Sequence, residues 1–381
     1  MNYFNLIKQY SRKAIGYPFL SDVTENRLTA SKKILFIYIT KPFRLKTRDK
    51  QFFAHQNIKQ CQQIVSLLGE KGFSVDLLDI NDNRHHPKGD YDVVISHRVS
   101  NCKQDAFTSK NNIYLATGLN HNIHNSQVLS RHQYLFERKG IKIAPKNLNP
   151  VDMPYVEKAD ELFCFGNEFV KNTWKQISKA ECLNFHNYGY DQTIYLGDDR
   201  NLDKARKSFL FFASTFQISK GLDLLLEIFA KNPDLHLYVC SLFANEREFC
   251  KIYSNELFKT KNIHPVGWVD VNSPLFYKLC ADCAFVIHPS CSDASPGSVV
   301  QTMHTGLIPI VTPHSGIDVD KFGFLLSNDR EDYIENVVRT VSDLSLNQLR
   351  ESSYQTRLTS IEKYSEQSFI NRWRELIETI T

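Results

Sequence analysis

Short apolar runs alternate with longer amphipathic segments along the whole chain. Apolar residues at helical spacing predict helices over residues 51–72 and 131–138. The short runs are apolar almost throughout, as in parallel sheets that helices cover on both faces. In the first half such strands are expected over residues 33–40, 73–80, 92–96, 113–116 and 162–165, with a further strand and loop over 142–150.

The second half repeats this alternation without repeating the sequence. The pattern therefore predicts an α/β protein with two doubly wound, Rossmann-like domains that face a cleft. Ligands of such sheets bind beyond the carboxyl ends of the strands, so the residues after each strand are the candidates for function. The expected strands are 209–213, 235–240, 263–266, 284–288 and 307–312, and the expected helices lie near 220–230, 245–258, 273–280 and 297–305.

Chain length and one polar stretch indicate the domain limits. A chain of 381 residues is longer than one hydrophobic core usually supports. Residues 197–201 are polar and form the best linker candidate, so the expected domains are residues 1–195 and 196–365. Residues 366–381 are expected to form a helix whose apolar stripe includes Phe369 and Trp373, and which crosses back to the first domain.

Composition narrows the function classes. The formal net charge is +4, from 46 basic and 42 acidic residues, and this balance argues against a nucleic-acid partner. Nine cysteines without the density of a secreted disulfide scaffold indicate thiols in a reducing compartment, so we expect a cytoplasmic protein. Cys280 and Cys283 have no second pair at zinc spacing, which favours core packing over a metal site.

The sequence predicts no transmembrane helix, because no apolar run reaches the roughly 18 to 20 residues that a bilayer requires. The N-terminus also lacks the pattern of a signal peptide. Leu6, Ile7 and Tyr10 nevertheless fall at helical spacing near Lys8 and Arg12. Two interpretations stay open for this segment: docking on the protein's own surface, or peripheral contact with the inner face of the membrane.

Lys220 stands at the start of an expected helix, where the helix dipole makes a positive charge unfavourable. Ser214 follows the preceding strand, and Gly221 separates Lys220 from the apolar face of the helix. An anion bound beside both the lysine and the helix would resolve this conflict. Two interpretations of Lys220 therefore stay open: an anion site and a solvated lysine.

A second candidate lies between the strand at 284–288 and the next helix. Ser295 suits the N-cap and Pro296 the first helical position. Gly297 lets a ligand approach the backbone, and the free amides around Gly297 and Ser298 can bind phosphate oxygens. The alternative is a well-capped structural helix.

Two polar side chains flank this helix start. Asp293 precedes the helix, and Gln301 lies eight residues later, about one turn inside it. Both can face a cleft at the carboxyl end of the sheet. One of them could hold a sugar and the other a ribose through hydrogen bonds.

Taken in order, these motifs resemble the GT-B glycosyltransferases, particularly the retaining bacterial enzymes called group 1 or family 4. The resemblance implies that Lys220 contacts the donor diphosphate, that Trp268 and Val269 lie by the base, and that Asp293 and Gln301 contact sugar and ribose. Asp293 and Gln301 replace a pair of glutamates in that family, and its usual arginine is replaced by Ser214 or Thr215. The segments that carry the resemblance are 219–223 (SKGLD), 262–269 (NIHPVGWV), 289–306 and 307–311 (LIPIV).

In the first half, residues 113–121 look like the strand and loop that bring a histidine over the donor sugar in this family. The resemblance thus makes His121 the catalytic candidate, together with Asp293. His97 and His124 are the competing histidines, and residues 166–168 are expected beside the cleft.

The resemblance implies a hexosyltransferase-type enzyme of polysaccharide biosynthesis. It would move a sugar from a nucleoside diphosphate sugar to a hydroxyl of a saccharide or lipid-linked saccharide, with retention, and the first domain would bind the acceptor. No cofactor or metal is expected, because Lys220 and helix-start amides would neutralise the departing diphosphate. Two alternatives stay open: a catalytically silent subunit that binds nucleotide sugar, suggested by Gln301 and the missing arginine, and a sugar-nucleotide epimerase on the same fold.

Overall fold

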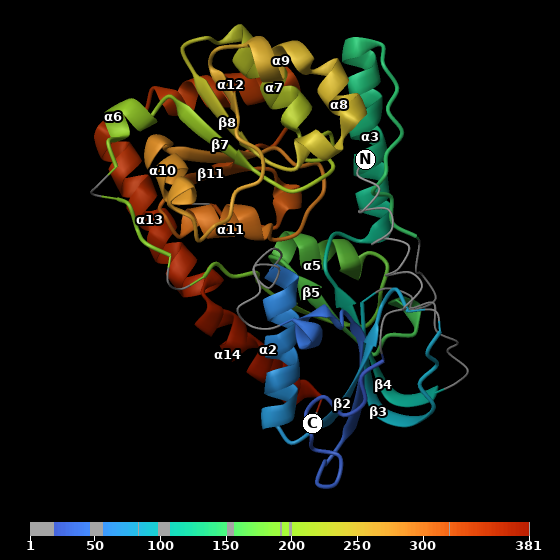
Figure 1. The fold of residues 1–381 in the computed structure, drawn as a ribbon. Helices are drawn as coiled ribbons and strands as arrows, with labels where there is room; N and C mark the ends of the chain where they lie inside the picture. Colours follow the sequence, from blue (N-terminus) through green and yellow to red (C-terminus); the bar gives the residue numbers. More distant parts are fainter. Residues whose placement is uncertain are drawn as a thin grey trace.

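Two parallel six-stranded sheets, each with helices on both faces, form the two halves of the computed structural model (Figure 1). The structure describes residues 19–45, 56–82, 84–97, 107–150, 156–190, 193–197, 200–319 and 321–380. The expected N-terminal amphipathic helix and two residues of the expected linker, Asp198 and Asp199, lie outside these residues. The predicted α/β architecture with two Rossmann-like domains is confirmed.

The first sheet has the strand order β2-β1-β3-β4-β5-β6, and its strands are short and buried as the apolar runs predict. Its order reverses between β1 and β3, which makes that edge the topological switch point. Residues 181–185 form a strand that the sequence pattern did not indicate. The elements of this half are β1 Lys33–Tyr38, η1 Lys41–Arg44, α2 Gln56–Glu70, β2 Ser74–Asp79, β3 Gly89–Ser96, β4 Phe107–Ala116, α3 His121–Lys139, β5 Glu161–Phe165, α5 Glu168–Lys175 and β6 Glu181–Phe185.

The second sheet has the order β12-β11-β10-β7-β8-β9, with its switch point between β7 and β10. The central strand β7 is buried on both sides because its side chains alternate between two hydrophobic clusters. Phe209 and Phe211 belong to one cluster, and Leu210 and Phe212 belong to the other. The elements of this half are α6 Leu202–Ala205, β7 Ser208–Phe212, α7 Leu222–Lys231, β8 His236–Cys240, η4 Phe243–Asn245, α8 Arg247–Ile252, α9 Ser254–Lys259, β9 Ile263–Pro265, α10 Pro274–Asp282, β10 Phe285–His288, α11 Gly297–Met303, β11 Ile308–Val311, η5 Pro313–Ser315, β12 Phe324–Leu325, α12 Glu331–Ser342 and α13 Leu346–Tyr364.

The C-terminal helix α14, Glu366–Thr379, crosses back to the first half as predicted. In Figure 1, α13 and α14 run down one side of the molecule from the second sheet to the first. Phe369 and Trp373 of α14 are buried in the hydrophobic core of the first sheet. The apolar stripe of α14 is thus buried in the first half. Because α14 directly follows α13 of the second half, it links the two halves.

Helix α3 joins the halves a second time, which the sequence pattern did not predict. Leu135 of α3 is buried in the core beneath the second sheet. The Arg138 guanidinium forms ion pairs with Asp223 and, at 3.0 Å, with Glu227, both on α7. The division at residue 195 stays a prediction, but the packing of α3 reaches across it.

The strand expected over residues 142–150 is wrong. The segment is irregular, and its backbone carbonyls accept hydrogen bonds from side chains of α3 rather than from a neighbouring strand. The Ile143 oxygen contacts His132 Nδ1 at 2.8 Å, and the Asn149 oxygen accepts from Asn125 Nδ2 at 2.8 Å. Side chains of the adjacent helix thus satisfy the polar backbone that a sheet would otherwise pair.

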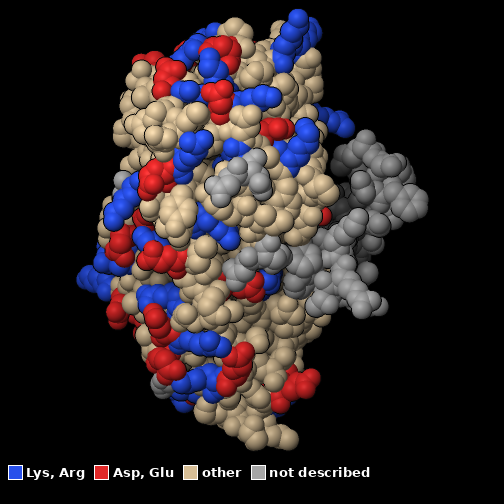
Figure 2. Space-filling model, turned by 90° about the vertical axis from the view of Figure 1, so that its left-hand side faces the viewer, with Lys and Arg blue, Asp and Glu red and all other residues tan. Residues whose placement is uncertain are grey.

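The surface carries charges of both signs (Figure 2), and the described cysteines form no disulfide. On the face shown in Figure 2, basic and acidic side chains are interspersed. No helix among the described residues is sufficiently long and apolar to cross a membrane. The eight described cysteines are free, and Cys280 and Cys283 pack in the hydrophobic cluster that contains Cys240.

Candidate functional site

A cavity of about 980 Å³ lies where the carboxyl ends of the two sheets face each other. Tyr38 and His97, which end or follow β1 and β3, line it from the first sheet. Ser214 and His288, which follow β7 and end β10, line it from the second. The cavity therefore lies over both topological switch points, where doubly wound sheets bind their ligands.

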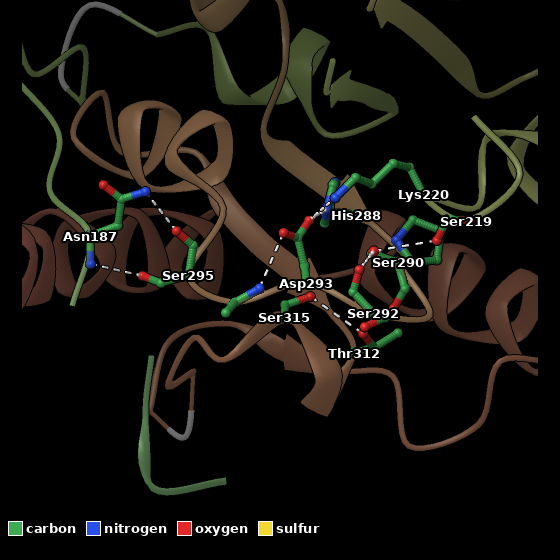
Figure 3. A network of polar contacts seen from close by, with 12 residues as sticks. Asn187, Ser219, Lys220, His288, Ser290, Ser292, Asp293, Ser295, Thr312 and Ser315 are labelled. Atoms are coloured by element: carbon green, nitrogen blue, oxygen red, sulfur yellow. Dashed lines mark hydrogen bonds and ion pairs between the residues drawn. The ribbon is translucent and has the colours of Figure 1, made fainter. Parts of the chain in front are cut away.

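Lys220 and Asp293 meet in the wall of this cavity. Lys220 comes from the turn before α7, Asp293 comes from the loop after β10, and their side chains form an ion pair (Figure 3). His288 Nε2 lies 3.0 Å from Asp293 Oδ2, and its ring is buried and stacked on Phe211. Both side chains of the ion pair keep about a fifth of their surface exposed, 18% and 19%, so a ligand can reach them.

The environment keeps Asp293 ionised. Burial raises the pKa of its carboxyl, but the Lys220 ammonium and the hydrogen bond from His288 outweigh burial and leave the pKa well below its usual range. Burial lowers the pKa of His288, with partial compensation from Asp293. The neutral imidazole then donates through Nε2 to a negatively charged carboxylate. Sequence reasoning did not single out His288, although its place at the end of β10 was a signal.

The loop that carries Asp293 is fixed by backbone contacts. Ser290 Oγ donates to the backbone carbonyl oxygen of Ser219 at 3.3 Å, and the backbone N–H of Cys291 donates to the same oxygen at 2.9 Å. Thr312 Oγ1 donates to the Ser290 oxygen at 2.6 Å. The loops after β7 and β10 are thus tied together, so Lys220 and Asp293 approach each other without relying on their own pairing (Figure 3).

The predicted cap of α11 is wrong by one residue. The helix begins at Gly297 with Pro296 as N-cap, and Ser295 lies outside it in a left-handed conformation, with φ of 44°. The Ser295 hydroxyl accepts a hydrogen bond from the backbone N–H of Asn187 at 3.1 Å. The side-chain Nδ2 of Asn187 donates to the backbone carbonyl oxygen of Ser295 at 2.8 Å. Asn187 therefore holds the strained residue in place, a role that no local sequence pattern indicates.

Pro296, Gly297 and Ser298 line the cavity, as does Gln301 one turn further along α11. Gln301 is only 4% exposed, and both ends of its amide are used. Its Oε1 accepts from the Tyr190 amide at 3.0 Å, and its Nε2 donates to Thr193 Oγ1 at 2.5 Å. These contacts fix Gln301 to the segment that connects the two halves.

Trp268 and Val269 line the cavity beyond β9. Trp268 is 53% exposed, whereas Val269 is buried in the hydrophobic cluster that contains Phe276. A large aromatic ring left half in solvent at the edge of a cavity offers a face on which a planar group can stack.

Gly221 allows the loop after β10 to approach the turn that carries Lys220. It has a left-handed conformation, with φ of 79°, and a Cβ atom there would lie 2.5 Å from the Pro289 oxygen. That oxygen accepts from Nη1 and Nη2 of Arg131 on α3, both at 3.1 Å. Glycine is therefore required where the loops after β7 and β10 and helix α3 approach one another.

His121 does not lie where it was expected. It begins α3, is 6% exposed and packs edge-on against Trp174, with Nε2 3.1 Å from the Tyr114 hydroxyl. Among the described histidines, those that line the cavity are His97 and His288. His121 is buried because the helix that it begins turns its ring towards β4 and α5. His124 bridges Ser292 Oγ and the Asn147 oxygen, at 2.8 and 2.7 Å.

Few charged side chains line the cavity. Among the described residues, Lys220 is the one lysine or arginine and Asp293 the one carboxylate that line the cavity. No group of three histidine, cysteine or acidic residues in the described ranges is placed to hold a metal ion. The cavity can thus offer one cation, one carboxylate and many neutral hydrogen-bonding groups to a ligand.

Comparison with known proteins relates the chain to solved structures only. No family model matches it, and no curated protein sequence does. HepE from Anabaena, solved with UDP-glucose, has a TM-score of 0.56 at 13% identity, covering 91% of this chain and 100% of that chain. Sucrose-phosphate synthase from Thermosynechococcus elongatus has a TM-score of 0.59 at 11% identity, covering 92% and 99%.

A third similar structure is WaaG, described as a glycosyltransferase involved in lipopolysaccharide biosynthesis. Its TM-score is 0.54 at 12% identity, and the alignment covers 90% of this chain and 99% of that chain. At such identities the likeness establishes the fold. The chain has the two-domain GT-B architecture along nearly its full length.

Proposed function

We propose that the protein is a glycosyltransferase that moves a sugar from a nucleoside diphosphate sugar to an acceptor hydroxyl. The observation that carries this proposal is the cavity over both switch points, with Lys220 and Asp293 together in its wall. A cation beside neutral donors suits a diphosphate, and an ionised carboxylate suits sugar hydroxyls. The similarity to HepE, whose structure holds UDP-glucose, supports the same assignment.

In the proposed reaction the acceptor oxygen forms a bond to the anomeric carbon while the bond from that carbon to the phosphate oxygen breaks. The acceptor proton leaves with the nucleoside diphosphate or with solvent. Lys220 stabilises the negative charge that develops on the leaving diphosphate, so no metal is required for that task. Retention of configuration is proposed on the resemblance to family 4, and Gln301 would contact the ribose.

The first half would bind the acceptor, because its side chains line the cavity opposite Lys220. We propose a saccharide or lipid-linked saccharide as acceptor, and the cytoplasm or the inner face of the membrane as the place of action. We also propose a hexosyl donor and a role in polysaccharide biosynthesis.

A transfer assay tests the function directly. Purified protein is incubated with radiolabelled UDP-, GDP- and dTDP-sugars and with saccharide and lipid-linked acceptors, and its melting temperature is measured with each nucleotide. We expect one donor to give labelled product. Stabilisation by a nucleotide with no labelled product from any pair would contradict the enzyme assignment.

That outcome would favour a second candidate, a subunit that binds nucleotide sugar without turnover. One observation supports this alternative: both ends of the Gln301 amide are already bonded to Tyr190 and Thr193 within the protein. A binding subunit would retain the melting shift with nucleotide, and it would stimulate transfer only when its catalytic partner is added.

Replacing Asp293 with asparagine is expected to tighten binding of free nucleoside diphosphate by about two- to fivefold, the worth of a partly exposed ion pair. Without ligand the carboxylate neutralises Lys220, and a phosphate must compete with it. Transfer should fall, because the proposed contact with sugar hydroxyls is weakened. Isothermal titration calorimetry measures the affinity, with Asp282→Asn, on the exposed end of α10, as control. Weaker diphosphate binding by Asp293→Asn would contradict the competition.

Trp268→Ala is expected to weaken nucleotide binding by about fivefold or more without lowering the melting temperature of the free protein. The expected loss follows from stacking of a base on an aromatic ring, worth about 1–3 kcal/mol, while stability is spared because the ring is 53% exposed. Phe258→Ala removes another exposed ring, 60% exposed and outside the cavity lining, and serves as control. Equal nucleotide affinity of the Trp268 variant and the wild type would remove Trp268 from the base site.

A further inference from the structure

Gln56 begins α2 in the first half and reaches across the cavity to the second. A Cβ atom at Gly297 would lie only 1.8 Å from Gln56 Oε1, so the glutamine amide rests directly on the backbone at Gly297. Gln56, Gly297 and Lys220 line the same cavity. Gln56 is therefore a group of the first half placed at the part of the second half that is expected to hold the donor.

The amide nitrogen of Gln56 is buried, and it has no hydrogen-bond partner in the described part of the chain. Neighbouring glutamines on α2 differ in this respect. Gln60 Nε2 donates to Asn187 Oδ1 at 2.6 Å, and Gln63 Nε2 donates to Glu366 Oε1 at 2.5 Å. Because a buried amide N–H without an acceptor is costly, the unpaired nitrogen indicates a group that completes its contacts with a ligand.

The position of Gln56 is set by the contacts of its own helix. Gln60, one turn later on α2, is bonded to Asn187, and Asn187 in turn holds Ser295, two residues before Gly297 (Figure 3). This chain of hydrogen bonds fixes α2 relative to the loop that carries Asp293. Gln56 is thus held over Gly297 before any ligand binds, so binding need not order it.

We propose that Gln56 Nε2 donates a hydrogen bond to a phosphate oxygen of the donor, so that the diphosphate is held by both halves of the protein. This inference rests on the proposed function. A phosphate fits better than a hydroxyl because Lys220, the one described lysine or arginine in the cavity lining, is paired with Asp293, four residues before Gly297. The Lys220 ammonium, which lies beside this loop through its ion pair with Asp293, supplies the positive charge that an anion requires.

Gln56→Glu provides a sharp test, because it keeps the shape of the side chain and replaces the N–H donor with an anionic oxygen. A carboxylate is favourable in the first turn of a helix, so the variant is expected to fold and to keep its melting temperature. Gln62→Glu is the matched control: it makes the same change on the same helix, at a residue outside the cavity lining.

Calorimetric titration with UDP, GDP and dTDP is carried out on the full chain for the wild type and both variants. We expect at least about tenfold weaker binding by Gln56→Glu and a change below twofold for Gln62→Glu. Equal affinity of Gln56→Glu and the wild type overturns the inference, as does a variant that changes only the KM for acceptor. If the wild type binds none of the three nucleotides, the proposed function itself fails, and this result is distinct from the other two.

Discussion

Lys220→Ala is expected to lower sugar transfer by about a hundredfold or more and to abolish the rise in melting temperature that nucleoside diphosphate produces. In the described part of the cavity lining no other lysine or arginine could neutralise the departing diphosphate. Removing one preorganised group that stabilises developing charge typically costs about 10²–10³ in kcat. Kinetic assays and thermal shifts with the best nucleotide measure both effects.

The variant should still fold, because Asp293 keeps its hydrogen bond with His288 when Lys220 is lost. Lys231→Ala, at the exposed last residue of α7, the helix that follows Lys220, removes an equal charge away from the cavity and is expected to have no effect on transfer. Lys220→Arg keeps the charge and should recover part of the binding. Undiminished nucleotide binding by Lys220→Ala would place the diphosphate elsewhere.

Much of the fold could be predicted because its signals are local. Strands such as 209–213 and 284–288 are short and apolar, and the structure places β7 and β10 there with shifts of one residue. The strand expected over 142–150 failed because Ile143 is only partly buried and packs against the hydrophobic cluster that contains Leu135 of α3, not in a sheet. That burial depends on a helix from one half packing on the other, which periodicity does not encode.

The sequence predicts those residues of the candidate site that follow the carboxyl ends of strands. Lys220 and Asp293 come together because both follow neighbouring central strands, β7 and β10, whose carboxyl ends meet at one edge. His121 was misplaced because its position depends on how α3 enters, and this is decided by packing against Trp174. Asn187 and Gln56 contribute contacts to residues more than a hundred positions away, so no spacing rule could reveal them.

Asp223→Ala is expected to lower the free energy of unfolding by about 3 kcal/mol, the lower end of the range for breaking a buried ion pair. Asp223 is fully buried at the start of α7, and Arg138 of α3 is nearly so. Burial raises the pKa of the Asp223 carboxyl, and the guanidinium only partly offsets this, so each charge depends on the other. Arg138 keeps its contact with Glu227 in the variant, which limits the loss.

Urea unfolding followed by circular dichroism measures this loss, with Asp282→Ala as the matched control. Asp282 pairs with Lys278 on the exposed surface of α10, at 3.3 Å, and its loss should cost less than about 1 kcal/mol. The double variant Arg138→Met, Asp223→Leu should recover only part of the stability: its apolar pair needs no compensation for buried charge, but Glu227 loses the guanidinium. If Asp223→Ala and Asp282→Ala unfold alike, this pair does not anchor α3 to the second half, and the contacts of Leu135 and Arg131 must do so.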